Sequence, residues 1–266
     1  MAHCYQVNMV NMLATLPMYD FAEIRQHTDR LWHEISRRLG EDIPLDRSRD
    51  YTYAWKEPIL LFSQICGFPF IHEFYQQLAY IATPHYAAEG CDGPNYCSLL
   101  FAIKNRPLED FRGLRAAVNS VDSMSGMLAL KLMVAPYAID RKFFHQTILS
   151  RSHVNSLLAL QQGRADVCAV DAVTVALIRR HRPELLTGLH MIAQSPKVPG
   201  LPFVTNIGGV AVIQNVLKDV FADGQLGQTR AALFLSGMTI LPPDAYEIIA
   251  DHQRRMQGPQ GVDLFC

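Results

Sequence analysis

Short apolar segments alternate with segments of helical spacing along most of this chain, and this alternation limits the fold more than any other feature. It is clearest in the middle third, where strand-like and helix-like segments follow one another in strict order: residues 115–118, 124–134, 146–149, 154–161, 167–170 and 172–181. Strand-like runs that alternate with helical patterns indicate βαβ units. We therefore predict the α/β class with mostly parallel sheets.

The outer parts of the chain follow the same rule less regularly. Residues 21–39 have helical spacing and precede Gly40, a residue that favours helix ends. A turn is predicted at Ser63-Gln64, directly after a short strand. The other predicted strands are residues 8–16, 59–62, 79–82, 98–103, 190–193 and 203–205, and the other predicted helices are residues 71–78, 210–221, 226–236 and 243–256.

Two connectors, KNRPLEDFRG and SPKVPGLP, divide the chain into three blocks. The middle block, residues 108–198, could bury its own core. Residues 1–104 and 202–266 would then form one discontinuous α/β lobe. Two chain crossings between two lobes are typical of a hinged ligand clamp, with hinges near 103–107 and 199–205. One continuous α/β domain with two surface loops explains the same pattern equally well.

The composition excludes several classes of protein. The chain has 266 residues, 49% of them hydrophobic, and a formal net charge of −1, so nothing attracts it generally to nucleic acid or to an anionic membrane. A short basic cluster at 179–182 is interpreted as a solvated helix end. No apolar run reaches the roughly 18 residues of a spanning helix, so no direct membrane insertion is expected. The N-terminal residues do not resemble a signal peptide, so we expect a cytoplasmic protein, or a periplasmic one whose leader was removed.

The six cysteines do not indicate a disulfide scaffold, because a chain of this length can bury a core without one. Cys168 lies in an apolar run and is expected in the core. A bridge between Cys66 and Cys91 stays open from sequence alone. A zinc site at Cys91, Cys97 and His85 is weakly indicated, because structural zinc usually needs paired short spacings. We predict no metal and no cofactor.

A cluster of small polar residues, NSVDSMSG, lies between the predicted strand at 115–118 and the next helix. The free N–H groups and the macrodipole of a helix start attract anions, and hydroxyl groups and a glycine add donors and space. The candidate ligands of an oxyanion are Ser123, Met124 through its N–H, Ser125 and Gly126. A plain N-cap is the simpler explanation. A nucleotide phosphate is disfavoured, because neither a Walker pattern nor G-x-G-x-x-G is present.

His153 and Asp171 open helices at the same predicted sheet edge. Ligands of open α/β sheets bind beyond the carboxyl ends of strands, so three polar helix starts on one edge favour a site there. A catalytic triad of Ser125, His153 and Asp171 is disfavoured, because nothing in the sequence places a base against a nucleophile. With no G-x-S-x-G or H-E-x-x-H pattern either, we predict no catalytic residue. The first block adds residues beside strands that could cover a ligand: Tyr19, Ser63, Gln64 and Tyr96.

Taken together, these segments resemble a known family. EDFRGLRAAVNSVDSMSGMLAL and SRSHVNSLLALQQGRADVCAVDAVTVALIRRHRPEL are similar to the phosphate/phosphite/phosphonate-type substrate-binding proteins of ABC transporters. The resemblance covers about residues 7–235 and is most specific at D-x-x-G-x-x-x-A-V-N, S-x-S-G and S-H…G-x-A-D-V…D. It implies the type 2 periplasmic-binding fold, with two α/β lobes and a ligand cleft between them.

The resemblance also implies roles for single residues. Four residues match the helix start that holds the oxyanion, namely Ser123, Met124, Ser125 and Gly126. His153 and Asp171 match polar residues of the same lobe, where Asp171 would select a cationic or hydroxyl group. The remaining candidates match first-lobe loops that face the cleft, namely Tyr19, Ser63, Gln64 and Tyr96. Few cationic residues lie at these positions, so anion binding would depend on neutral donors.

The leading hypothesis is a cleft-closing, non-catalytic binder of a small phosphonate- or phosphate-like anion, as the solute-binding component of ABC transport. Its partners would be the small-molecule anion and an ABC permease, and we expect a monomer or a weak dimer without nucleic acid. The alternatives are a cytosolic enzyme on the same fold, with menaquinone- or pyrimidine-precursor chemistry, and a ligand sensor.

Overall fold

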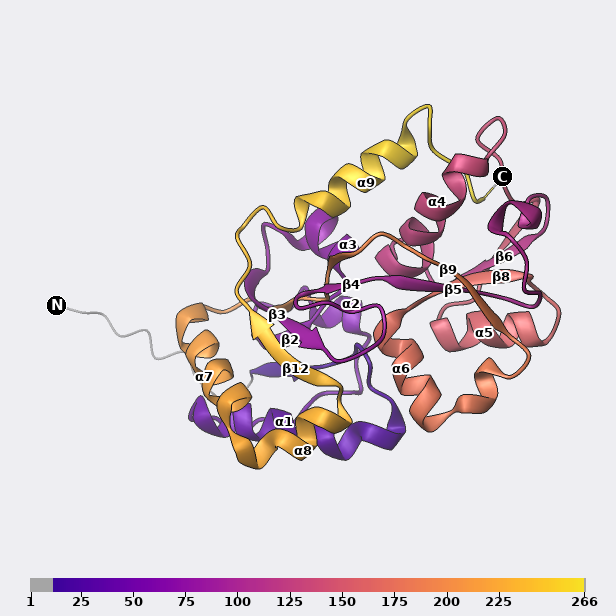
Figure 1. Ribbon diagram of the computed structural model, residues 1–266. Coiled ribbons are helices and arrows are strands. Elements are labelled where there is room, and N and C mark those ends of the chain that lie inside the picture. The colour runs from indigo at the N-terminus through magenta and orange to yellow at the C-terminus, as the bar shows by residue number, and fades with distance from the viewer. Residues whose placement is uncertain (1–11, 266) are drawn as a thin grey trace.

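The computed structural model describes residues 12–265, which form two five-stranded sheets lying beside each other (Figure 1). The predicted strand residues 8–11 lie outside the described residues. The strand order is β1-β2-β11-β3-β12 in the first sheet and β7-β6-β8-β5-β9 in the second. We call the first sheet with the helices packed on it the first lobe, and the second sheet with its helices the second lobe.

Both sheets are mixed, so the prediction of mostly parallel sheets is wrong. The first sheet contains β1 (Leu13–Thr15), β2 (Leu60–Gln64), β11 (Phe203–Thr205), β3 (Ala79–Tyr86) and β12 (Leu235–Thr239). The second contains β7 (Gln146–Leu149), β6 (Arg115–Val118), β8 (Val167–Asp171), β5 (Ser98–Ala102) and β9 (His190–Gln194). β1 and β2 are parallel, as are β6, β7 and β8. Three strands run antiparallel to their neighbours, namely β11 and β12 in the first sheet and β5 in the second.

Several predicted boundaries differ from the structure. The predicted turn at Ser63-Gln64 is the buried end of β2. The boundary at residue 104 would leave Ser98–Ala102 with the first lobe, but this strand pairs with β8 and β9 of the second sheet. The helix predicted to reach residue 236 ends earlier, and Leu235–Thr239 forms β12 instead. The positions of the hinges stay predictions.

The helices cover the sheets and are named here with their bounds. Those of the first lobe are α1 (Arg25–Arg38), α2 (Tyr51–Ala54), α3 (Gly67–Pro69), α7 (Val210–Ala222) and α8 (Gly227–Ala232). Those of the second are α4 (Ala129–Val134), α5 (His153–Gln161) and α6 (Ala172–His181), and α9 (Glu247–Gln257) comes near the C-terminus. Shorter 3₁₀ or π turns are Ala22–Ile24, Phe70–Phe74, Leu108–Phe111, Met124–Leu128, Ala135–Tyr137, Pro183–Leu186 and Gly224–Leu226.

Helix α1 shows how the sequence builds the first lobe. Leu31, Trp32 and Ile35 recur at helical spacing, and all three are buried against the sheet and α7. Burying a side chain of this size contributes about 1.5–3 kcal/mol. The Trp32 ring lies 5.4 Å from that of Phe62 in β2. Gly40, in the left-handed region at φ +81°, follows the helix end, as predicted.

The chain passes between the two sheets through a two-stranded ribbon. β4 (Asn95–Tyr96) pairs antiparallel with β10 (Val198–Pro199), and each belongs to one of the two crossings. β5 begins two residues after β4. Both crossings therefore lie side by side near the middle of the molecule (Figure 1).

The C-terminal segment contacts both lobes. Tyr246, just before α9, donates a 2.7 Å hydrogen bond to the Gly200 carbonyl, and Ile249 packs against Gly67 of α3. Beyond α9, Asp263 accepts hydrogen bonds from Arg141 of the second lobe. The last residues that the structure describes accordingly lie near α4 (Figure 1). Residues 202–266 were predicted to belong to the first lobe, but the end of this segment contacts the second lobe.

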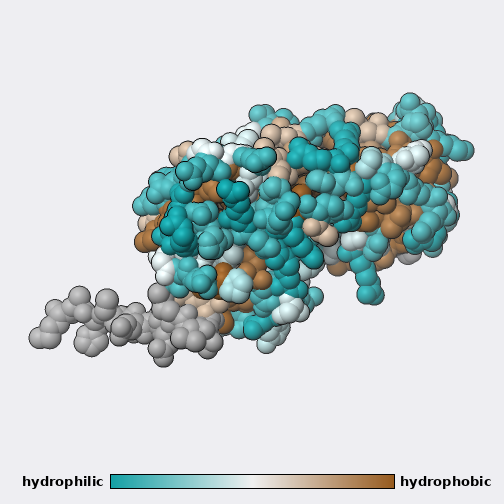
Figure 2. Space-filling model, turned by 90° about the horizontal axis from the view of Figure 1, so that it is seen from below, coloured by the Kyte–Doolittle hydropathy of each residue, from teal (hydrophilic) through white to brown (hydrophobic). Residues whose placement is uncertain are grey.

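The face shown in Figure 2 is mainly hydrophilic, with hydrophobic residues in small separate areas. Such scattered apolar residues are ordinary on a protein surface. None of the helices in the described part of the chain has the length and hydrophobicity needed to cross a membrane.

Candidate functional site

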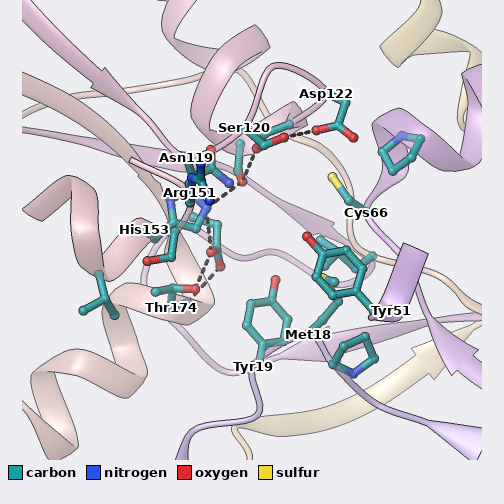
Figure 3. A pocket seen from close by; sticks show the side chains of 18 of the residues that line it. Met18, Tyr19, Tyr51, Cys66, Asn119, Ser120, Asp122, Arg151, His153 and Thr174 are labelled. Carbon is teal, nitrogen blue, oxygen red and sulfur yellow. Dashed lines mark hydrogen bonds and ion pairs between the residues drawn. The ribbon is translucent and has the colours of Figure 1, made fainter. Parts of the chain in front are cut away.

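A cavity of about 290 Å³ lies between the lobes, where the carboxyl ends of β6, β7 and β8 face the loop after β1 and helix α2. Figure 3 shows Asn119, Arg151 and His153 on one side of it and Tyr19 and Tyr51 on the other. The lining residues are Pro17, Met18, Tyr19, Phe21, Tyr51, Trp55, Cys66, Pro69, Asn119, Ser120, Asp122, Ser123, Ser125, Arg151, Ser152, His153, Val154, Asp171, Thr174 and Leu201. Five predicted site residues are thereby brought together, namely Tyr19, Ser123, Ser125, His153 and Asp171.

The polar cluster after β6 forms one end of the cavity. Ser123 is the N-cap of the turn that leads into α4, and its Oγ accepts a 2.9 Å hydrogen bond from the Gly126 N–H. A Cβ atom on residue 126 would lie 1.7 Å from Asn119 Oδ1. Glycine is therefore needed here to seat the Asn119 side chain against the helix start, rather than to admit a ligand.

Ser125, His153 and Asp171 contact one another at the centre of this wall. His153 Nε2 lies 3.0 Å from Ser125 Oγ and 3.4 Å from Asp171 Oδ2. In a hydrolytic triad the acid and the nucleophile hold opposite ring nitrogens. Here both contacts fall on Nε2, so the acid does not orient the ring toward the serine, and the arrangement differs from that of a catalytic triad.

Asp171 combines a structural role with its contact to the imidazole. As the N-cap of α6, its Oδ1 accepts a 2.8 Å hydrogen bond from the Thr174 N–H, and its Oδ2 accepts one from the Thr174 hydroxyl group. Burial lowers the pKa of His153, and the neighbouring Asp171 carboxylate acts in the opposite direction. The ring is therefore fixed by neighbours on two elements, with Ser125 on one and Asp171 on the other.

Two non-glycine residues in the cavity wall adopt left-handed backbone conformations. Arg151 has φ +73° and Tyr19 has φ +64°. Such conformations cost about 1–3 kcal/mol and are concentrated at functional sites. Arg151 is exposed, and its guanidinium group makes no hydrogen bond or ion pair with any other residue that the structure describes. The cavity wall therefore contains a guanidinium group that was not among the residues predicted from the sequence.

The first-lobe wall is aromatic. Tyr51 in α2 and Trp55 just after it have ring centroids 5.1 Å apart. Trp55 is fixed from behind, because its Nε1 donates a 3.1 Å hydrogen bond to Ser63 Oγ and its ring lies edge-on to Phe74. Tyr19 packs edge-on against Tyr86 at 5.4 Å. Tyr51 with Trp55, and Tyr19 with Tyr86, therefore form two packed aromatic pairs on the first-lobe side of the cavity.

The structure does not place the other five predicted residues in the cavity wall. The Ser63 hydroxyl group supports Trp55, and Gln64 Nε2 donates 3.0 Å hydrogen bonds to the Tyr86 hydroxyl and the Leu201 carbonyl. Both were predicted to be accessible turn residues, but β2 continues through them. Met124 has its side chain in the core, so the predicted role of its N–H stays a prediction, and Gly126 accommodates Asn119. Tyr96 is buried in the ribbon beside Ser125, where burial raises the pKa of its hydroxyl group.

The cysteines described are free thiols, so Cys66 and Cys91 are not bridged in this structure. Cys66 lines the cavity, and burial raises the pKa of its thiol to about 11. It is therefore a neutral, weakly polar part of the first-lobe wall. Among the residues that are described, no cluster of three His, Cys, Asp or Glu side chains is spaced to hold a metal ion.

Several lining residues were not predicted. Asn119, Ser120 and Asp122 belong to the cluster already singled out, and Arg151 precedes His153 by two residues, so proximity to predicted positions was a usable signal. Tyr51 follows no predicted strand. Its position depends on how the segment between α1 and β2 folds back over the sheet, and no local pattern indicates this.

The two sheets, the paired crossings and the cavity between them define a two-lobe, periplasmic-binding-protein-like fold. Solved structures share it. PhnD1 from Prochlorococcus marinus, in complex with methylphosphonate, is 14% identical with a TM-score of 0.76, covering 92% of this chain and 98% of that chain. A binding-protein component of an ABC phosphonate transporter from Pseudomonas aeruginosa is 20% identical with a TM-score of 0.71, covering 91% and 85% respectively. Curated proteins gave no match.

The model of one family, described as "ABC transporter, phosphonate, periplasmic substrate-binding protein", matches residues 69–238. The match spans more than half of the chain, which therefore belongs to this family of solute-binding components of ABC transport. This confirms the fold class and the family indicated by the sequence motifs. Substrate binding for transport, rather than catalysis, is the role of the family.

Proposed function

We propose that the interlobe cavity binds a small phosphonate-like oxyanion, with the negative head group against the second lobe. The observation that carries the proposal is the convergence of Ser125, His153 and the unpaired Arg151 on one wall of the cavity. Hydroxyl and imidazole groups supply directional hydrogen bonds, while the guanidinium supplies a charge that matches an oxyanion in geometry. Asp171 would hold His153 in place rather than contact the anion.

The lobes would close on the ligand by bending at the ribbon. β4 and β10 pair with each other and lie between the sheets, so a rotation there moves one lobe against the other without breaking either sheet. We therefore place the first crossing before Ser98, at residues 87–97 instead of 103–107, and the return crossing at residues 195–202 instead of 199–205. Closure would bring Tyr19 and Tyr51 onto a ligand already held by Ser125.

Substitution of Ser125 tests the head-group site. In Ser125→Ala, loss of one hydrogen bond to the anion should weaken binding by about 1–3 kcal/mol. Isothermal titration with methylphosphonate and inorganic phosphate measures the change. Ser48→Ala, which removes a hydroxyl group bonded only to Asp46 outside the cavity, is the matched control and should leave affinity unchanged. Equal affinities of Ser125→Ala and the wild type would remove Ser125 from the site.

The family also supports a proposal about partners and location. We propose that the loaded protein delivers its ligand to an ABC permease, and that it does so in the periplasm. A strain lacking the gene should lose uptake of the bound phosphonate and regain it on complementation. Uptake that continues unchanged would separate ligand binding from transport and favour a sensory role.

A further inference from the structure

The two walls of the cavity differ sharply in chemistry. Of the eleven second-lobe lining residues, only Val154 has an apolar side chain. On the opposite wall, none of the nine residues from the first lobe and the return connector carries a charged or amide side chain. A ligand that fills this cavity therefore meets polar groups at one end and apolar or aromatic surface at the other.

Tyr51 is the most accessible part of the aromatic wall. Its side chain is 42% exposed although it lines the cavity, and its helix is started by an Asp50 cap that accepts a 2.8 Å hydrogen bond from the Thr52 N–H. Behind it, Trp55 is only 2% exposed and is held by Ser63. An exposed aromatic ring that is packed against a buried one can contact a ligand at a low cost in conformational entropy.

The volume of the cavity also favours a ligand larger than methylphosphonate. If each of the five non-hydrogen atoms of methylphosphonate takes no more than the share of one liquid water, about 30 Å³, the whole molecule occupies about 150 Å³. The cavity holds about 290 Å³. Before the lobes close, a small oxyanion at Ser125 and His153 would thus leave the aromatic half to water, and an organic substituent would displace that water.

We infer that the preferred ligand is an organic oxyanion with an apolar, ring-sized substituent that packs against Tyr51, whose ring is supported from behind by Trp55. This inference rests on the proposed function, because it takes the head group to be bound by the second lobe. Burial of ring surface should make such a ligand at least about tenfold tighter than methylphosphonate. Tyr51 then acts as a specificity residue that distinguishes large from small substituents.

Titration calorimetry with four probes tests the inference: inorganic phosphate, methylphosphonate, benzylphosphonate and 2-aminoethylphosphonate. Benzylphosphonate should bind most tightly. Tyr51→Ala should remove most of its advantage over methylphosphonate, while Tyr51→Phe should keep it. Tyr53→Ala is the matched control, because Tyr53 lies on the same helix, is 61% exposed and does not line the cavity. Thermal melting of each variant checks that it is folded.

The outcomes separate the two proposals. If methylphosphonate binds but benzylphosphonate binds no more tightly, or if Tyr51→Ala leaves its advantage intact, the aromatic-substituent inference is overturned and the oxyanion site stands. Tightest binding of 2-aminoethylphosphonate also overturns it, since a cation held by Asp122 would then set the preference. If none of the four oxyanions binds, the proposed function itself fails.

Discussion

At the scale of single residues, the site combines a largely buried imidazole, whose pKa is lowered by burial, with an exposed guanidinium group. His153 contacts Ser125, Asp171 and the backbone around Ala169, and burial is the larger influence on its pKa. Arg151 contributes an exposed guanidinium group at the cavity wall. Under the proposed function, an arriving oxyanion would be attracted first by Arg151, and its charge would then favour a proton on His153.

Because the pKa of His153 is lowered by folding, the free energy of unfolding should depend on pH. Its folded-state pKa lies below the ordinary value of 6.5, so the unfolded chain binds a proton more readily than the folded one. The ligand-free protein should lose stability as the pH falls from 6.5 toward the folded-state value, and regain it as the pH rises. Urea unfolding of wild type and His153→Gln between pH 7.5 and 5 measures this, and the variant should lose less stability. Parallel curves would contradict the prediction.

At the scale of elements, the basic end of α6 is solvated, as the sequence suggested, and it also contacts the first lobe. Arg182 makes two hydrogen bonds of 2.7 and 2.9 Å to Glu23 of the first lobe. Arg180 donates to the Ala231 carbonyl at 3.0 Å and lies 3.6 Å from the ring centroid of Phe234. The Arg182 hydrogen bonds lower the pKa of Glu23 to about 2. The pair is therefore complete above pH 4.5 and is lost as the pH falls toward 2.

These contacts should hold the lobes together around a ligand. In the double variant Arg180→Ala/Arg182→Ala, we expect a larger radius of gyration by X-ray scattering and about two- to tenfold faster ligand dissociation, because surface pairs contribute about 0.2–1 kcal/mol each. Arg179→Ala is the matched control from the same helix, since its partner Glu89 lies in the connector between β3 and β4. Unchanged scattering and dissociation would show that closure does not depend on this end of α6.

Elements differ in how well the sequence predicts them. Four elements have the predicted bounds, because each is a short strand-like or helical pattern flanked by residues that favour turns. They are residues 115–118, 146–149, 172–181 and 203–205. β12 was missed because Ser236 and Gly237 interrupt its apolar pattern, and it forms only by pairing with the edge of β3. Likewise, His153 and Asp171 were predictable from the rule for strand ends, whereas Tyr51 reaches the cavity through long-range packing.

At the scale of the whole molecule, the main chain of residues 12–265 passes between the lobes at the two crossings in the ribbon and again in the C-terminal segment. Residues 258–265 lie on the second lobe, where Lys142 bridges to Asp263 and Val262 and Leu264 are buried. The start of α9 is anchored to the first lobe through Tyr246 and Ile249. A rigid-body rotation of the lobes must therefore bend or carry this segment as well as the ribbon.

If the C-terminal segment is an integral connection, its buried side chains should contribute to global stability in spite of their position. Leu264 is 3% exposed and Phe265 is 45% exposed. Leu264→Ala should lower the free energy of unfolding by about 2–4 kcal/mol through lost burial and an incompletely filled cavity, while Phe265→Ala should change it by less than about 0.5 kcal/mol. Equilibrium urea unfolding of both variants measures the difference. Equal small effects would mean that the last residues detach before the lobes unfold, and the ribbon alone would then set how the two lobes move.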